Sequence, residues 1–372
     1  MDPIALFEQA VKQPDDYIEQ WKREHGGSAV ATFCSYTPVE IIIAAGALPV
    51  RIFGTGDAFS LSDTLLQTYC CSLVRGILND VLAGKLNYID GAVFPHTCDS
   101  IQRLSDIWRL NTHFSMHLDV VLPVKLNTPA SADYMVRVIE KFRKDLASHL
   151  KVTISEDKLK TAVRKTNAVR SMLAGLDRIR NAQPDLFSAA GMYLAVRAAM
   201  VMWPDQWLPA AADLLAGLEK HVSASAFTGK KIVLSGGMCG TSAIYDIIQN
   251  SGGTVVHDDL CTGARFFEGL VDETADPIAA VADRYRERII CPAKHSGIHA
   301  RADYLVDTVR KKNADGVIFL LLKFCDPHAF DYPYLKQRLD DEHIPSLFLE
   351  VEDQSAPGQQ AATRIEAFIE ML

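Results

Sequence analysis

Cysteine is the residue type in this sequence whose number and placement suggest chemistry. The chain has eight cysteines, at positions 34, 70, 71, 98, 239, 261, 291 and 325. In the stretch GVIFLLLKFCDPHAF, an apolar run stops at Cys325 and Asp326-Pro327 follows at once. Thiolates bind soft metals and iron–sulfur clusters, whereas a buried thiol that binds nothing behaves as a small hydrophobic group. The elements that carry the cysteines decide between these two interpretations.

The apolar runs predict strands that alternate with helices in two parts of the chain. Strands are expected at 28–34, 50–54, 89–98 and 118–126, and again at 230–237, 254–260, 317–325 and 345–352. Such alternation predicts parallel sheets with right-handed crossovers. The fold class is therefore α/β, with two lobes of parallel sheet flanked by helices and a helical segment between them. We predict an N-terminal lobe with leading helices at 1–130, the helical segment at 131–224 and a C-terminal lobe at 225–372.

Local signals place several helices. One N-terminal helix is expected over 5–27, ended by Gly26-Gly27, and another over the pattern of 61–84. Asp99 is expected to cap a helix that follows it. Thr37-Pro38 begins another helix, in which Glu40 is expected to be a solvated acid of the first turn.

The cysteines fall where these elements place ligands. Cys34, Cys98, Cys261 and Cys325 lie at or just past predicted strand ends, and Cys239 follows a glycine turn. Parallel α/β sheets bind ligands outside the carboxyl ends of their strands. The sequence therefore predicts a cluster of functional thiols in one crevice.

The spacing of the thiols bears on what they bind. Structural zinc sites usually use closely spaced CxxC pairs, and this sequence has none. An iron–sulfur cluster held by thiolates from separate strand ends fits better, and nearby helix N-termini would stabilise its anionic sulfurs. Spacing alone leaves the choice of metal open.

Composition argues against several classes of partner. The chain has 372 residues, a net charge of −8, 48% hydrophobic and 23% charged residues. These values are typical of a globular protein and argue against a nucleic-acid or membrane-surface partner. No apolar run approaches the roughly 20 residues that span a bilayer, and MDPIALFEQA lacks the features of a signal peptide. We expect a cytoplasmic protein without stabilising disulfides.

Several stretches together resemble the 2-hydroxyacyl-CoA dehydratase / benzoyl-CoA reductase superfamily, in order and over nearly the whole chain. They are FCSYTPVEIIIAAGALPVRIFG, TYCCSLVRG, YIDGAVFPHTCDSIQRLSDIW, DGVIFLLLKFCDPHAFDYPYLK and TRIEAFIEML. The length is similar to that of the smaller catalytic subunit. The resemblance implies a [4Fe-4S] cluster with one open iron, held by Cys71, Cys98 and Cys325. Cys70 is the rival of Cys71, which the register of SLVRG favours.

The resemblance also implies a reaction and partners. A separate iron–sulfur activator hydrolyses ATP and delivers an electron, and a second catalytic subunit of the same superfamily completes the enzyme. The electron passes to an acyl-CoA thioester and forms a ketyl-type radical anion. Dehydratases of the superfamily then expel the 2-hydroxyl group of an (R)-2-hydroxyacyl-CoA, whereas aryl-CoA reductases protonate the ring. RLSDIWRLN resembles the smaller benzoyl-CoA reductase subunit, so we expect that type.

Two alternatives remain open at this point. A third branch of the superfamily holds a double-cubane [8Fe-9S] cluster with six cysteines and reduces small molecules, and here Cys34, Cys239 and Cys261 would complete the six. A non-catalytic electron-transfer or scaffold subunit is the other alternative.

Three polar residues near the motifs are candidates for catalysis. Ser35 could donate a hydrogen bond to a thioester carbonyl or a sulfide, or could cap the next helix. His96 and His328 lie beside Cys98 and Cys325 and could supply protons, or could serve a structural role.

Overall fold

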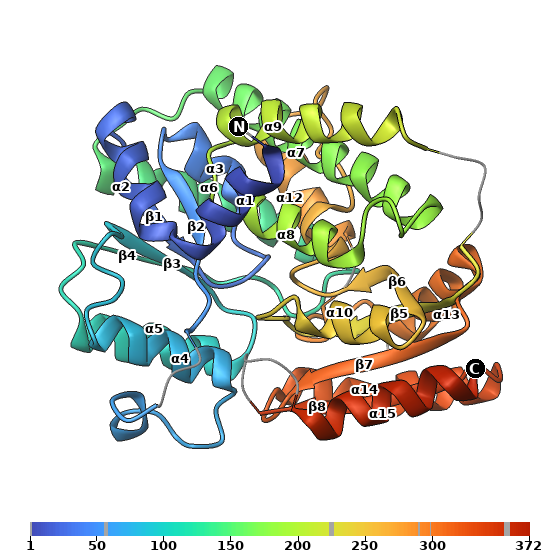
Figure 1. Ribbon diagram of the computed structural model, residues 1–372. Helices are drawn as coiled ribbons and strands as arrows, with labels where there is room; N and C mark the ends of the chain where they lie inside the picture. Colours follow the sequence, from blue (N-terminus) through green and yellow to red (C-terminus); the bar gives the residue numbers. More distant parts are fainter. Residues whose placement is uncertain (1, 56–58, 223–226, 289–290, 298, 353–357) are drawn as a thin grey trace.

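A computed structural model describes residues 2–55, 59–222, 227–288, 291–297, 299–352 and 358–372, and it contains two parallel sheets flanked by helices (Figure 1). The first sheet consists of β1 (Ala29–Thr32), β2 (Leu48–Arg51), β3 (Gly91–Pro95) and β4 (Met116–Val120). The second consists of β5 (Lys230–Gly236), β6 (Gly253–Asp259), β7 (Gly316–Leu322) and β8 (Ser346–Val351). The predicted α/β class with two parallel sheets is confirmed.

Both sheets have the same strand order. The orders are β2-β1-β3-β4 and β6-β5-β7-β8, so the first strand of each sheet lies between its second and third strands. Every strand pair is parallel. In each sheet the second strand lies on one side of the first strand, and the third strand lies on the other side. The direction in which strands are added therefore reverses beside β1 and beside β5, and ligands of such sheets bind at the point of reversal.

Helices cover the faces of the sheets and fill the region between them. Those before β5 are α1 (Pro3–Lys12), α2 (Pro14–His25), α3 (Val39–Ala44), α4 (Ser72–Leu82), α5 (Asp99–Asn111), α6 (Pro129–Leu150), α7 (Glu156–Ala182), α8 (Ala189–Ala199) and α9 (Pro204–Glu219). Those after it are α10 (Ala243–Asn250), α11 (Ala264–Phe267), α12 (Pro277–Glu287), α13 (Ala300–Lys312), α14 (Asp326–Asp341) and α15 (Gln359–Met371).

The structure corrects two of the predicted helices. The region 5–27 holds α1 and α2, because Pro14 cannot continue the hydrogen-bond ladder of α1 and instead takes the first position of α2. The region 61–84 holds a short 3-10 helix, η1 (Ser62–Thr64), and then α4, which begins only at Ser72.

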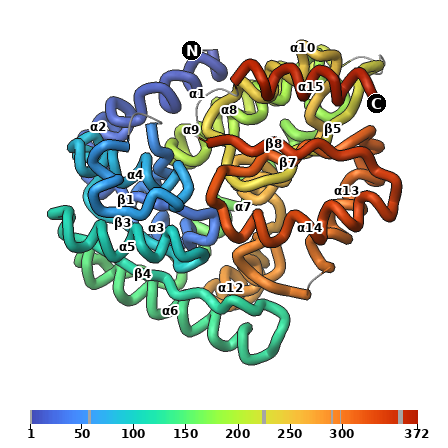
Figure 2. The backbone as a smooth tube through the Cα atoms, turned by 90° about the horizontal axis from the view of Figure 1, so that it is seen from below, coloured from blue at the N-terminus to red at the C-terminus, as the bar shows by residue number. Residues whose placement is uncertain are grey.

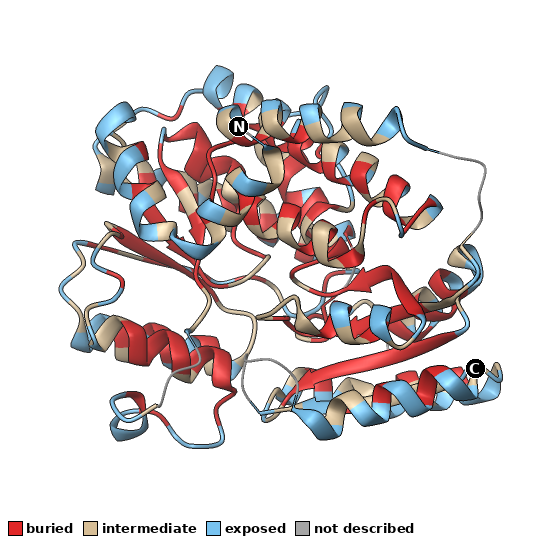
Figure 3. Cartoon of the chain, in the orientation of Figure 1, coloured by how far each residue is buried: buried red, intermediate tan, exposed pale blue. Residues whose placement is uncertain are grey.

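Burial explains why the strands form where they do. All seven residues of β7 and all seven of β6 are buried, as expected of parallel strands covered on both faces. Figure 3 shows the buried residues concentrated on the strands and on the inward faces of the helices. Within the described ranges, no helix has both the length and the apolarity to span a bilayer.

The two lobes lie side by side, with the first from blue to cyan and the second mainly from orange to red (Figure 2). Side chains join them: Arg51 Nη2 approaches Met238 Sδ at 2.8 Å, and Lys294 Nζ donates to the carbonyl oxygen of His96 at 3.3 Å. Helix α12 also packs against α6, next to the first sheet. The domain boundary at 130/131 stays a prediction, and the boundary at 224/225 lies outside the described residues.

A histidine of β6 makes the stability of the fold dependent on pH. His257 is 3% exposed and its Nε2 lies 2.8 Å from the hydroxyl of Tyr304. Burial lowers the pKa of His257 to about 4. The imidazole has a pKa of about 6.5 in the unfolded chain. Between about pH 6.5 and about pH 4 the unfolded chain therefore binds more protons than the folded chain, so the free energy of unfolding falls as the pH drops through this range.

We expect His257 to contribute about 3 kcal/mol of pH-dependent stability, all of it present above about pH 6.5. Urea unfolding from pH 4.5 to 7 measures this contribution in the wild type and in His257→Gln. The free energy of unfolding should fall less steeply with acidification in the variant. Parallel pH profiles of the two proteins would contradict the assignment.

Candidate functional site

The three cysteines singled out as cluster ligands each stand immediately before a helix. Cys71 precedes α4, Cys98 precedes α5 and Cys325 precedes α14. Cys98 takes the capping position that was predicted for Asp99, which is the first residue of α5. Backbone N–H groups and the helix dipole favour negative charge at this position, so a thiolate there is stabilised.

The sequence predicted that Cys325 is the last residue of a strand. The structure corrects this prediction. Strand β7 ends at Leu322, and two further residues turn the chain before Cys325. Phe324 adopts a φ of 64°, which side-chain-bearing residues rarely do. This turn allows the chain to leave the sheet and start α14 at once, with the thiol of Cys325 at the junction.

One cavity of about 680 Å³ is lined by all three cysteines. Its wall comes from both lobes, because the starts of α4 and α5 belong to the first and the start of α14 to the second. Cys71 lines the cavity, and its neighbour Cys70 is not part of the lining. The structure thus brings the predicted ligands to one space, and their role as ligands stays a prediction.

Burial sets the protonation of these thiols. It raises the pKa of Cys98 to about 12 and the pKa of Cys325 well above its ordinary value, and it also raises the pKa of Cys71. The three side chains are therefore neutral thiols in the metal-free chain. Metal binding would require them to lose their protons, and the metal charge would provide the compensation.

The donor set and the space fit an iron–sulfur cluster better than a single ion. No group of three or more His, Cys, Asp or Glu side chains in the described part of the chain is arranged to hold one metal ion. A four-iron cluster is larger than one ion, so its thiolates stand further apart. Three thiols around one cavity suit that larger group.

A second group of thiols lies beside the first. Thr97 Oγ1 donates to Cys34 Sγ at 3.6 Å, and Ser35 Oγ contacts Cys261 Sγ at 3.9 Å. Cys291 is close enough to Cys261 and Cys34 for their negative charges to raise its pKa, after the larger effect of burial, to about 11. Sequence reasoning missed Cys291, which follows no predicted strand and belongs to no recognised motif.

Arginines surround Cys261. Burial alone would raise the pKa of Cys261, but the guanidinium groups of Arg265, Arg51 and Arg288 outweigh burial and lower it. Arg265 Nη1 lies 4.0 Å from the sulfur, and Arg288 holds the backbone and hydroxyl oxygens of Ser35 at 2.7 and 2.8 Å. Cys261 is therefore disposed to be a thiolate.

Cys239 belongs to a different environment. It is 3% exposed and packs in the hydrophobic core of the second sheet, next to Tyr193 and Tyr245. Its thiol lies 3.0 Å from the carbonyl oxygen of Thr241. The structure places Cys291, rather than Cys239, with the thiols of the crevice.

The predicted catalytic polar residues have other partners. His96 Nε2 lies 2.9 Å from Asp119 Oδ1, and His96 is not among the cavity-lining residues. His328 is 6% exposed, and burial, with Arg265 and Arg301 nearby, lowers its pKa well below its ordinary value. Ser35 accepts from Arg288 and does not line the 680 Å³ cavity.

Lys294 is a cavity residue that no sequence pattern marked. Its side chain is 2% exposed, and Nζ contacts the carbonyl oxygens of His96 and Leu122 at 3.3 and 3.4 Å. The pKa of Lys294 is lowered, because burial outweighs the opposite effect of the neighbouring thiols of Cys34, Cys291 and Cys98. Lys294 is therefore near thiols of both groups.

Comparison with known proteins assigns the family. The family model described as 2-hydroxyglutaryl-CoA dehydratase, D-component, matches residues 34–372. The chain belongs to this family. One benzoyl-CoA reductase subunit, from Thauera aromatica, is 28% identical over 357 residues, covering 94% of this chain and 91% of that protein.

Two dehydratase subunits are similar over almost their full lengths. The (R)-phenyllactyl-CoA dehydratase beta subunit of Clostridium sporogenes is 24% identical over 366 residues, with 98% of this chain and 97% of that protein covered. The beta subunit of (R)-2-hydroxyglutaryl-CoA dehydratase from Acidaminococcus fermentans is 24% identical over 378 residues, with 99% and 98% covered. The superfamily predicted from the motifs is therefore confirmed.

Proposed function

We propose that this chain is the iron–sulfur subunit of an enzyme that reduces a CoA thioester by one-electron, ketyl-radical chemistry. Cys71, Cys98 and Cys325 would hold a [4Fe-4S] cluster. The observation that carries the proposal is the cavity of about 680 Å³ that all three thiols line. When bound, the cluster would supply a low-potential electron and an iron with an open position.

The residues of this chain would prepare the site in three ways. The N-termini of α4, α5 and α14 stabilise negative charge on the thiolates. Lys294 places a buried amino group at the cavity wall, where negative charge on neighbouring thiols would favour its protonated form. An apolar core packs against the three thiols, so charge on this side of the cavity is screened less than in bulk water.

The cavity rim supports a two-subunit enzyme. Phe330, Val124, Tyr334 and Phe324 line the cavity and are 78, 58, 46 and 41% exposed. Exposed apolar residues gathered at one mouth are typical of an interaction surface. We assign this rim to a second catalytic subunit of the same superfamily. A separate iron–sulfur activator that hydrolyses ATP would be the electron donor. We place all three proteins in the cytoplasm.

The two reaction types receive different support. RLSDIWRLN and the benzoyl-CoA reductase relative support an aryl-CoA reductase, the type that the motifs favour. The family model and the two beta subunits support an (R)-2-hydroxyacyl-CoA dehydratase as the alternative.

The second group of thiols supports another candidate, the double-cubane [8Fe-9S] reductase. Cys34, Cys261 and Cys291 would complete six ligands together with the first three cysteines. Arg51, Arg265 and Arg288 provide the positive charge that so many thiolates would need.

Iron analysis of anaerobically purified protein tests these assignments. A single cubane predicts about four irons and four sulfides per chain, and a double cubane predicts about eight irons and nine sulfides. In Cys291→Ser, iron content should stay unchanged for a single cubane and should fall for a double cubane. Protein that binds no iron under anaerobic reconstitution would contradict both. Full turnover by this chain alone, without partner or ATP, would contradict the two-subunit scheme.

A further inference from the structure

The wall of the 680 Å³ cavity contains basic residues that differ in their partners. They are Lys294, His295 and Arg301. Arg301 donates from Nε to Asp331 at 2.6 Å and from Nη2 to Asp259 at 3.1 Å, so carboxylates balance its charge. His295 is exposed to solvent, whereas Lys294 is 2% exposed. The partners of Lys294 therefore decide what this buried amino group can do in the cavity.

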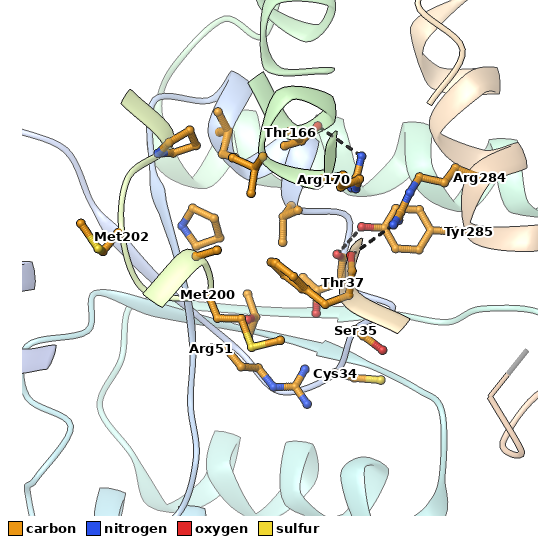
Figure 4. A pocket seen from close by; sticks show the side chains of 18 residues that line it. Cys34, Ser35, Thr37, Arg51, Thr166, Arg170, Met200, Met202, Arg284 and Tyr285 are labelled. Atoms are coloured by element: carbon orange, nitrogen blue, oxygen red, sulfur yellow. Dashed lines mark hydrogen bonds between the residues drawn. The ribbon is translucent and has the colours of Figure 1, made fainter. Parts of the chain in front are cut away.

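The arginines near the thiols serve the second group of thiols. In Figure 4, Arg51 lies beside Cys34 at one end of a smaller pocket. Arg51, Arg265 and Arg288 surround Cys261, and none of these three arginines lines the 680 Å³ cavity. A group bound in the cavity therefore has to draw positive charge from the cavity wall itself.

The segment that carries Lys294 is fixed to the first lobe. The N–H of the next residue, His295, donates to the carbonyl oxygen of Val124 at 2.8 Å, and its carbonyl oxygen accepts from the N–H of Leu126 at 2.7 Å. Nζ contacts two further carbonyl oxygens of the same lobe, one of which belongs to His96. The amino group is therefore held in one place at the cavity wall.

The amino group of Lys294 lacks a carboxylate partner. The two carbonyl oxygens that it contacts carry no net charge. The groups whose negative charge would favour its ammonium form are the thiols of Cys34, Cys98 and Cys291, and no carboxylate of the described chain is among them. Buried charges in proteins are paired or bind metals. An anionic group in the cavity would complete the pairing.

We infer that Lys294 sets the reduction potential of the cluster bound in this cavity, by compensating the negative charge that reduction adds. The inference rests on the proposed function and deepens it. Reduction adds one electron, supplied in the enzyme by the activator, and makes the bound cluster more negative by one unit. The potential of an iron–sulfur cluster depends on net charge and on solvent exposure. A fixed ammonium in a wall that screens charge weakly favours the reduced form and raises the potential.

Redox titration of the anaerobically purified protein, followed by electron paramagnetic resonance, tests the inference in two variants. Lys294→Gln removes the charge but keeps an amide donor for the carbonyl oxygens, whereas Lys294→Arg keeps both the charge and the donors. In Lys294→Gln, the ratio of reduced to oxidised cluster at a given solution potential should fall at least tenfold, which corresponds to about 59 mV for a one-electron couple. In Lys294→Arg, the ratio should stay within about threefold of the wild type.

Lys323→Gln is the matched control. Lys323 lies two residues before Cys325, but its side chain is 36% exposed and pairs with Glu352 at 3.1 Å. Solvent and the counter-charge screen this lysine, so its replacement should change the ratio by less than about threefold.

An unchanged potential in Lys294→Gln would overturn the inference, as would an equal shift in Lys294→Arg or in Lys323→Gln. Iron per chain, measured on the same samples, separates charge from anchoring. Loss of iron in both Lys294 variants would show an anchoring role and overturn the inference, whereas loss in Lys294→Gln alone would support it, because charge is the property that only this variant lacks. Wild-type protein that binds no iron would refute the proposed function together with the inference. An iron-loaded wild type whose potential is kept in Lys294→Gln would refute the inference alone.

Discussion

Cys325→Ser is expected to lose the iron–sulfur cluster and all activity while the chain stays folded. Serine has nearly the same volume, but its hydroxyl is rarely ionised near neutral pH and is a poor ligand for iron in such clusters. Strand β7 is held by apolar packing and ends three residues earlier, so the fold does not need the thiol. Iron per chain, measured on the soluble anaerobic variant, is the decisive quantity.

The matched control for this variant is Cys70→Ser. Cys70 is buried next to Cys71 but does not line the cavity, so its replacement should leave iron content unchanged. If Cys325 were only a packed core thiol, serine would cost about 1–3 kcal/mol of stability. Wild-type iron in Cys325→Ser, accompanied only by a lower melting temperature, would refute its assignment as a ligand.

Glu40→Gln is expected to lower the free energy of unfolding by about 3–5 kcal/mol. Glu40 is fully buried, and its carboxylate pairs with Arg170 and accepts from Tyr285. Burial would raise the pKa of Glu40, but Arg170 and Arg284 outweigh it and lower the pKa, so the carboxylate is charged. The amide would leave the Arg170 guanidinium buried without a counter-charge. Urea unfolding at pH 7 measures the loss.

A surface pair on the same helix as Arg170 provides the comparison. Lys165 pairs with Asp205, whose side chain is 53% exposed, so Asp205→Asn should change the free energy of unfolding by no more than about 1 kcal/mol. A similarly small change for Glu40→Gln would show that the buried pair does not stabilise the fold as argued.

The sequence predicted β5 and β7 well because they contain nearly continuous apolar runs, whereas β2 and β4 begin two residues before the predicted stretches and end well inside them. The observed ends of β5 lie within one residue of the predicted ends, and those of β7 within three. Glu40 shows where such reasoning fails. Its position in the first turn of α3 suggests solvent, and only the packing of α7 and α12 against that turn buries it.

The candidate site was predictable only in part, for a related reason. Cys71, Cys98 and Cys325 precede helices, and a local motif can mark such a position. Cys291 and Lys294 lie in an irregular segment that follows α12, and the packing of α12 against α6 holds this segment at the crevice. No local pattern encodes that long-range contact. The same limitation placed Cys239 with the crevice thiols, although it lies in the core of the second sheet.

The position of the three cysteines before helices has a mechanical consequence. Cys71 and Cys98 are anchored to the first lobe through α4 and α5, and Cys325 is anchored to the second lobe through α14. A rigid group bound to all three thiols would therefore add a link between the lobes, beside the side-chain contacts of Arg51 with Met238 and of Lys294 with His96 that already join them. Its loss would leave the lobes joined by those contacts and by their shared apolar core.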